Sequence, residues 1–273
     1  MVPRLCNRIP HVSPEMVASV VASISEPRFA PYRAATANDV AALELYRWNL
    51  GATSAVGETV GVVEVALRNA IDYHLRMWYA AQLPSHGKTY NYDWVRNPAP
   101  PLFGLLNITT RSGRQESAYT SALARARKDA DNRDSQHPRA GAFVNHDDTV
   151  AHLMFGTWVN LLPNPRHDPA NNPSSTSRRT FGMQKVIWDN SLKYAFPYQH
   201  NSATVYVWAD RIYQARNQGA HHEPFIHADL VSLHRAAARL LKAIDPNVEA
   251  WYTGISTLPD VIRVKPSIAA VSI

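Results

Sequence analysis

Arginine and histidine stand five residues apart near the end of a predicted helix, in the sequence Arg216-Asn217-Gln218-Gly219-Ala220-His221. A guanidinium can hold two phosphate oxygens, and an imidazole can move a proton near neutral pH. The pair therefore suits cleavage of RNA, in which the 2′-hydroxyl attacks and a fixed cation stabilises the phosphorane, without a metal ion. From the residues alone, a simple charge pair at a helix end is the alternative.

The five-residue spacing makes a demand on the backbone. At about 100° per residue, two positions five apart on an unbroken helix point about 140° away from each other. Gly219 can adopt the left-handed conformation that ends a helix, so we expect it to turn the chain and bring His221 back toward Arg216. Asn217 is expected to hold the terminal carbonyls or the histidine in place.

A second arginine and histidine on the long predicted helix could resemble a catalytic pair. Arg68, Asn69 and His74 form this looser arrangement, but Arg68 and His74 are six residues apart. Six residues of continuous helix subtend about 240°, so the two side chains are not expected to meet. Glu64 and Arg68, four apart, are expected to pair on one helix face.

A cluster of metal-binding residue types follows the helix end, and comprises His221, His222, Glu223 and His227. It lacks the HExxH spacing, and Pro224 interrupts it, so an exposed loop is the favoured interpretation. We expect no metal and no cofactor. A metal-dependent hydrolase that uses this cluster remains a third hypothesis.

The elements that must position these residues are helical. Apolar spacing and capping residues predict helices over 13–24, 38–50, 54–79, 146–162, 184–196, 203–217 and 228–244. Neither strand alternation nor a fixed repeat stands out, so the predicted fold class is all-α, one domain over 1–273. Four tryptophans at apolar helical positions are expected in the core: Trp48, Trp158, Trp188 and Trp208.

Residues 81–145 are rich in Pro, Ser, Asn, Arg and Asp, and are predicted to be a polar insertion with one helix over 115–131. Its basic residues indicate a solvated face or a surface for RNA, and they are Arg111, Arg114, Arg125, Arg127, Lys128, Arg133 and Arg139. Aromatic residues in the same segment could stack on single-stranded RNA, namely Tyr90, Tyr92 and Trp94. The tail 251–273 shows no clear periodicity and is expected to be loosely structured.

The composition is that of a packed protein, with 45% hydrophobic and 18% charged residues. A formal net charge of +6 favours polyanionic partners such as nucleic acid, although ordinary solubility explains it equally well. Cys6 is the only cysteine, so an intrachain disulfide is impossible and a reducing compartment is favoured. The apolar run after Met16 is too short for a membrane span, so we expect a cytoplasmic protein.

The string Arg-Asn-x-x-x-His at 216–221 resembles the signature of HEPN domains, which are helical modules found in many prokaryotic RNases. Further segments resemble the Abi-like (abortive-infection) family: 24–29, Tyr46-Arg47-Trp48-Asn49, 64–71 and Phe155-Gly156-Thr157-Trp158. Together they extend from about Ile24 to Ile244. The resemblance implies a HEPN-like helical bundle.

The resemblance also implies a phage-defence or toxin-like endoribonuclease that leaves a 2′,3′-cyclic phosphate. In that family the motifs of two modules meet across a cleft, so we expect a homodimer that binds RNA, held by an antitoxin or defence partner. Arg216 would stabilise the phosphorane, His221 would transfer protons, and Asn217 would support both. Glu64, Arg68 and His222 would bind substrate. A catalytically silent HEPN module that binds RNA or a protein remains the alternative.

Overall fold

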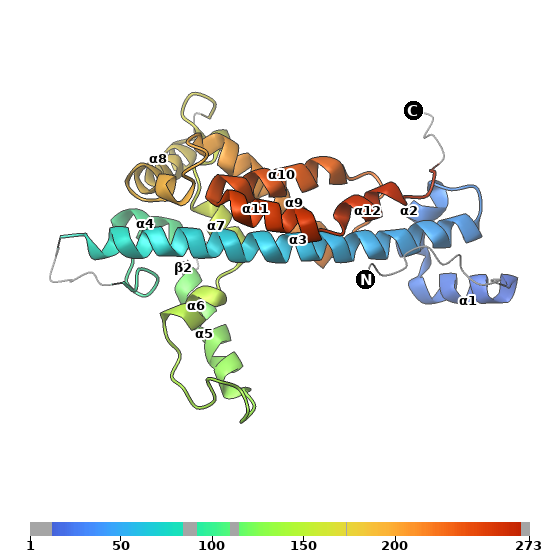
Figure 1. Cartoon of the computed structure of the whole chain (residues 1–273), viewed down its shortest axis with the longest axis horizontal. Coiled ribbons are helices and arrows are strands. Elements are labelled where there is room, and N and C mark those ends of the chain that lie inside the picture. Colours follow the sequence, from blue (N-terminus) through green and yellow to red (C-terminus); the bar gives the residue numbers. More distant parts are fainter. Residues whose placement is uncertain (1–12, 84–91, 110–114, 173, 269–273) are drawn as a thin grey trace.

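The computed structural model describes residues 13–83, 92–109, 115–172 and 174–268. Within these ranges the protein is built almost entirely of helices, with twelve α-helices, two short 3₁₀ helices and one small hairpin. The prediction of an all-α fold is therefore confirmed. Figure 1 shows the helices gathered along α3, which follows the long axis of the molecule.

The N-terminal elements are α1 (Pro14–Ile24), α2 (Glu26–Ala34) and α3 (Asp39–Ala80). The middle of the chain forms α4 (Pro100–Leu106), β1 (Asn107–Thr109), β2 (Gln115–Ser117), α5 (Ala118–Asp131), α6 (His146–Ala151) and α7 (Phe155–Asn160). The remaining elements are η1 (Pro165–His167), α8 (Ser175–Asn190), η2 (Leu192–Ala195), α9 (Ser202–Ala220), α10 (Leu230–Ile244), α11 (Pro246–Ile255) and α12 (Leu258–Arg263).

Helix α3 is one continuous helix of 42 residues, so the prediction of two helices separated at Gly51 is wrong. Asn38 caps it as expected, because its side chain accepts a hydrogen bond from the Ala41 N–H. Gly51 costs only about 1 kcal/mol inside a helix. The apolar residues on either side of it stay in phase and are buried, and this burial outweighs the local cost.

The C-terminal helices form a layer against α3. Helix α10 packs on α3, α9, α11 and α12, and its apolar face is buried (Figure 1). The expectation of a loosely structured tail is wrong up to Arg263, because α11 and α12 bury Tyr252, Leu258 and Val261. The Val261 carbonyl also accepts a hydrogen bond of 2.8 Å from the Trp48 indole. Residues 269–273 lie outside the described part.

Helices α5 and α6 extend away from α3 on the opposite side (Figure 1). The predicted helix over 115–131 begins later, at Ala118, because Gln115 to Ser117 pair with Asn107 to Thr109 in the hairpin. Trp94 is fully buried, so the structure excludes it as one of the aromatic residues that could stack on RNA. Tyr92 is exposed, whereas Tyr90, Arg111 and Arg114 lie outside the described residues.

Two further helix predictions need correction. The helix expected over 146–162 is two short helices, because the chain turns at His152 and Leu153, and α7 begins only after the N-cap residue Met154. Helix α8 begins at Ser175, where Ser174 caps it, nine residues before the predicted start. Of the four tryptophans, Trp48, Trp158 and Trp188 are buried as expected, and Trp208 packs half-buried against the core.

Helix α3 is long and apolar enough to cross a membrane by length and composition, a test that a core helix of a soluble protein also passes. Sixteen of its residues are buried in the protein. In the fold it acts as the central support, because α2, α9, α10, α12 and η2 all pack on it.

Candidate functional site

The end of α9 carries the predicted catalytic residues, and it ends differently from the prediction. The helix continues through Gly219 to Ala220, and His222 takes the left-handed conformation with φ of 55°. The His222 N–H donates to the Gly219 carbonyl (3.1 Å), and the Glu223 N–H donates to the Gln218 carbonyl (3.0 Å). These two bonds are those of a Schellman motif, with histidine where glycine is usual. The prediction that Gly219 breaks the helix is therefore wrong.

The unbroken helix sets the relation between Arg216 and His221. His221 is the C-cap residue, and its N–H still donates to the Asn217 carbonyl at 3.0 Å. The two side chains therefore leave the helix about 140° apart and do not converge within this chain. Among the described residues, no hydrogen bond joins them. Arg216 instead donates to the neighbouring Asn217 side chain at 3.4 Å, and His221 is exposed.

Arg216 meets two predicted residues of α3. Burial raises the pKa of the Glu64 carboxyl, while the charges of Arg216 and Arg68 act in the opposite direction without cancelling the effect. The predicted pairing of Glu64 with Arg68 is a longer-range attraction, because the Arg68 guanidinium donates to Asn69 at 3.3 Å instead. Two guanidiniums and a half-buried carboxyl thus share one region between α3 and α9. Such a carboxyl with a raised pKa is suited to proton transfer.

A residue without a predicted role fixes the turn that follows α9. The Asn49 side chain, 4% exposed on α3, accepts a hydrogen bond of 2.7 Å from the Phe225 N–H. Gln218 donates to the Pro224 carbonyl at 2.8 Å, so both ends of the turn are held. Asn49 belongs to the Tyr46–Asn49 segment that carries the family resemblance. No local signal in the sequence indicates that Asn49 is buried, because its partner Phe225 is 176 positions away.

His222 faces a cavity of about 840 Å³ between α1, α2 and the first half of α3. The lining includes hydroxyl and cationic side chains, among them Ser19, Ser23, Arg28, Tyr46 and Thr53. His222, predicted to bind substrate, is thus placed beside both the exposed His221 and a cavity large enough for a nucleotide-sized ligand.

The other sequence candidates do not form sites. Burial lowers the pKa of His74, whose ring lies between Tyr73 and Tyr194, and six residues of continuous helix separate it from Arg68. Across the described ranges, the cluster His221 to His227 does not bring three ligand atoms together.

The basic residues of the middle segment are partly used within the fold. Arg133 and Arg139 bind the buried Asp148 carboxylate at 3.0 and 2.8 Å. Arg125 donates to the His152 carbonyl at 2.8 Å. Arg127 and Lys128 remain exposed on α5. A contact surface for RNA on α5 is therefore smaller than the sequence indicated.

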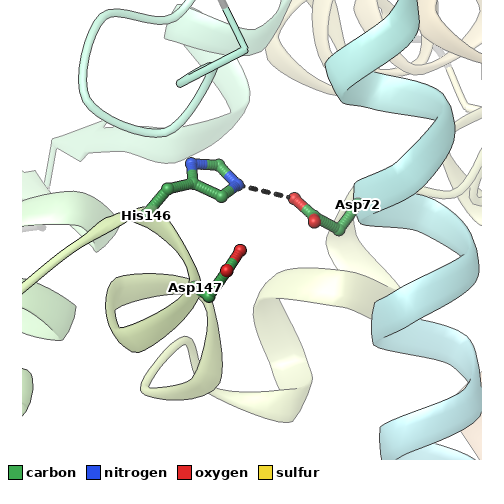
Figure 2. Close-up of side chains that lie close together, drawn as sticks. All are labelled: Asp72, His146 and Asp147. Atoms are coloured by element: carbon green, nitrogen blue, oxygen red, sulfur yellow. Dashed lines mark hydrogen bonds and ion pairs between the residues drawn. The ribbon is translucent and has the colours of Figure 1, made fainter. Parts of the chain in front are cut away.

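A second polar cluster, which sequence reasoning missed, joins α3 to α6. His146 Nε2 lies 2.9 Å from Asp72 Oδ1, and His146 Nδ1 lies 3.0 Å from Asp93 Oδ1. The Trp94 indole donates to the same Asp72 oxygen at 2.8 Å. Figure 2 shows the third acidic residue, Asp147, directed toward the space beside Asp72 and His146. Residues 74 positions apart gave no local signal for this cluster.

Electrostatics distinguish this cluster from the end of α9. Burial alone would lower the pKa of His146, but hydrogen bonds and charges from Asp72 and Asp93 outweigh it and raise the pKa to about 9. The imidazole therefore carries a positive charge at neutral pH. Arg76 supplies a second cation, 3.1 Å from Asp147 and 3.7 Å from Asp72.

Comparison with known proteins finds no matching family model, no matching curated protein and no matching solved structure. The likeness to HEPN and Abi-like proteins therefore rests on the sequence segments quoted above.

Proposed function

We propose that the protein is a metal-independent endoribonuclease of the HEPN type, with Arg216 and His221 as its catalytic residues. The observation that carries the proposal is the grouping of Arg216, Arg68 and the half-buried Glu64 between α3 and α9, the helix that ends at the exposed His221. The guanidiniums bind the phosphate and stabilise the phosphorane, and His221 transfers the proton. Asn217 orients Arg216, and His222 contacts the RNA beside the cavity.

The catalytic unit in this proposal is a homodimer. Arg216 and His221 of one chain point about 140° apart, so one active site uses the arginine of one chain and the histidine of the other. The support is the continuity of α9 through Ala220. The biological setting that we propose is a cytoplasmic toxin-like or phage-defence RNase, which an antitoxin or another defence component holds inactive.

The test is incubation of the purified protein with total RNA in excess chelator, beside Arg216→Ala and His221→Ala. Matched controls are Arg239→Ala and His200→Ala, which change exposed residues of the same types. We expect fragments with 2′,3′-cyclic phosphate ends from the wild type and both controls only. Cleavage that persists in both site variants would overturn the proposal.

One observation favours a second candidate, a catalytically silent module that binds RNA or a protein. The same continuity of α9 keeps the two motif residues apart within one chain. If the wild type binds RNA but leaves it intact, and expression is not toxic, the silent module is correct. Toxicity that disappears in His221→Ala supports the enzyme.

A further inference from the structure

We propose that Asp72, His146 and Asp147 form a binding site for a divalent transition-metal ion, with Zn²⁺ as the best match. Each residue offers one ligand atom, and the three atoms lie within 4.8 Å of one another. Figure 2 shows Asp147 directed toward the space beside the other two side chains. In the part of the chain that the structure describes, no other group of three such residues is this close.

The ligand types define the class of ion. An imidazole nitrogen with two carboxylate oxygens is a donor set that Zn²⁺ accepts, and three protein ligands leave one position of a tetrahedral ion for water. Mg²⁺ and Ca²⁺ prefer oxygen ligands only, so the imidazole disfavours them. Asp72 and His146 are 12% and 11% exposed, whereas Asp147 is 67% exposed. The ion therefore enters from the Asp147 side.

The groups behind the ligands are arranged as in established metal sites. Asp93 lies 3.0 Å from His146 Nδ1, so it fixes the ring and directs Nε2 toward Asp72. A carboxylate in this position also makes a histidine a stronger ligand. The Trp94 indole donates to Asp72 at 2.8 Å and holds that carboxylate in place. Both buried ligands are thus oriented by residues outside the ligand set.

The local charge also favours a cation. Three carboxylates surround the ligand atoms, those of Asp72, Asp93 and Asp147, whereas the guanidiniums that face them are those of Arg76, beside Asp72 and Asp147, and Arg96, which acts on Asp93. The carboxylates therefore outnumber the guanidiniums.

Two groups compete with the ion. It must displace the proton from His146 Nε2, and it must move Arg76 away from Asp147. Arg76 is 36% exposed, so its guanidinium can swing toward solvent. The site is therefore one that binds metal in exchange for a proton and a salt bridge.

The bound ion would link elements that are distant in the sequence. Asp72 belongs to α3, the other two ligands begin α6, and Asp93 lies in the segment that leads to α4. The ion would therefore fasten the part of the molecule that carries α5 and α6 to the central helix. This role is separate from RNA cleavage, which we propose to need no metal.

The experiment uses the tag-free full chain, stripped of metal by chelator and then freed of the chelator. Zn²⁺, Mn²⁺ and Mg²⁺ are titrated separately by calorimetry, and metal content is measured after equilibrium dialysis. The variants are Asp147→Ala and His146→Gln, and the matched control is Asp131→Ala, at an exposed aspartate of α5. Thermal unfolding is followed with and without Zn²⁺, as a readout independent of activity.

We expect the wild type and Asp131→Ala to bind one Zn²⁺ that both variants bind at least about tenfold more weakly. Zn²⁺ should raise Tm in the first pair and not in the second. Because Asp147 is exposed, its variant keeps the fold even if His146→Gln does not. Equal Zn²⁺ affinity in Asp147→Ala and wild type, or tighter binding of Mg²⁺, would overturn the site. RNA cleavage in chelator tests the proposed function independently.

Discussion

The end of α9 and the cluster around His146 both combine histidine with charged residues, but they differ in how fully these residues are paired and buried. The cluster of Asp72, Asp93 and His146 is called the closed cluster, and the region of Glu64, Arg216 and His221 is called the open site. Around His146, every ring nitrogen has a carboxylate partner within 3.0 Å, and its side chain is 11% exposed. At the end of α9, His221 is exposed, and the one hydrogen bond of the Arg216 side chain to a described residue is the 3.4 Å bond to its neighbour Asn217. The first arrangement is complete within one chain, whereas the second leaves its groups available to RNA or to another chain. The following experiments test that difference.

The largest effect should follow loss of either catalytic residue. We expect Arg216→Ala and His221→Ala each to lower the rate of RNA cleavage about 10²- to 10⁴-fold. If two chains share each site, co-expression of the variants produces mixed dimers with one intact site of two. A random mixture should then recover about a quarter of wild-type activity. No recovery in demonstrated mixed dimers would show that each chain works alone.

Breaking the closed cluster should destabilise the fold strongly. His146→Ala removes the nearer of the two cations beside the buried Asp72 carboxylate and leaves Arg76 at 3.7 Å, so we expect the free energy of unfolding to fall by about 3 kcal/mol. The measurement is urea unfolding in chelator, so that metal binding does not contribute. His200→Ala, at an exposed histidine, should change stability by less than about 0.5 kcal/mol. Similar losses in both variants would contradict the comparison.

Asn49 connects the open site to the core. Asn49→Ala leaves the buried Phe225 N–H without its acceptor, so we expect a loss of about 1–3 kcal/mol in the free energy of unfolding. Asn247→Ala, at an exposed position of α11, should have little effect. RNA cleavage should fall with Asn49→Ala, because the turn that carries His221 and His222 loses its anchor. An unchanged stability would mean that another acceptor replaces Asn49.

The sequence predicted the helical fold and most helix positions because apolar spacing and caps such as Ser13 and Asn38 are local signals. It failed where a distant contact decides the outcome. Gly51 suggests a break locally, yet burial on both sides keeps α3 continuous. The tail has weak periodicity, yet Trp48 and Val261 bind across 213 positions. Trp94 lies in a polar segment, but Asp72 supplies its buried partner.

The candidate site was predicted in part for the same reason. The motif at 216–221 is contiguous, so its residues could be identified from the sequence. Glu64 was expected to lie beside this motif, and its electrostatic interaction with Arg216 agrees with that position. The ending of α9 was not predictable, because glycine and histidine compete for the left-handed position. The turn fixed by Asn49 and Gln218 gives that position to His222.

Substitution of the two glycines tests where the left-handed residue lies. Gly219 is helical, and an added Cβ would lie 3.7 Å from Phe225 and 3.8 Å from Thr53, which is ordinary contact. We therefore expect Gly219→Ala to raise the free energy of unfolding by about 0.5–1 kcal/mol. Gly141, with φ of 70°, is the matched control, and its alanine variant should lose about 1–2 kcal/mol. Destabilisation by Gly219→Ala would restore the predicted helix break.

The smallest expected effect concerns Glu64 at the open site. Burial raises the pKa of Glu64 in the folded protein. At a pH between its unfolded and folded pKa values, folding is therefore accompanied by the uptake of a proton. Stability from this group is therefore present at low pH and lost as pH rises through the folded pKa. Glu64→Gln removes that cost, so we expect the variant to be slightly more stable than wild type at pH 7.

The difference between Glu64→Gln and wild type should vanish on acidification. Chemical unfolding measured from pH 4 to pH 7 tests this, with Glu44→Gln at an exposed position of α3 as the control. A variant that is less stable at pH 7 would mean that attraction to Arg216 and Arg68 outweighs burial. The open site would then resemble the closed cluster, in which burial of Asp93 is outweighed by the hydrogen bond and charge of His146, so that the pKa of its carboxyl is lowered. The electrostatic contrast between the two regions would then disappear.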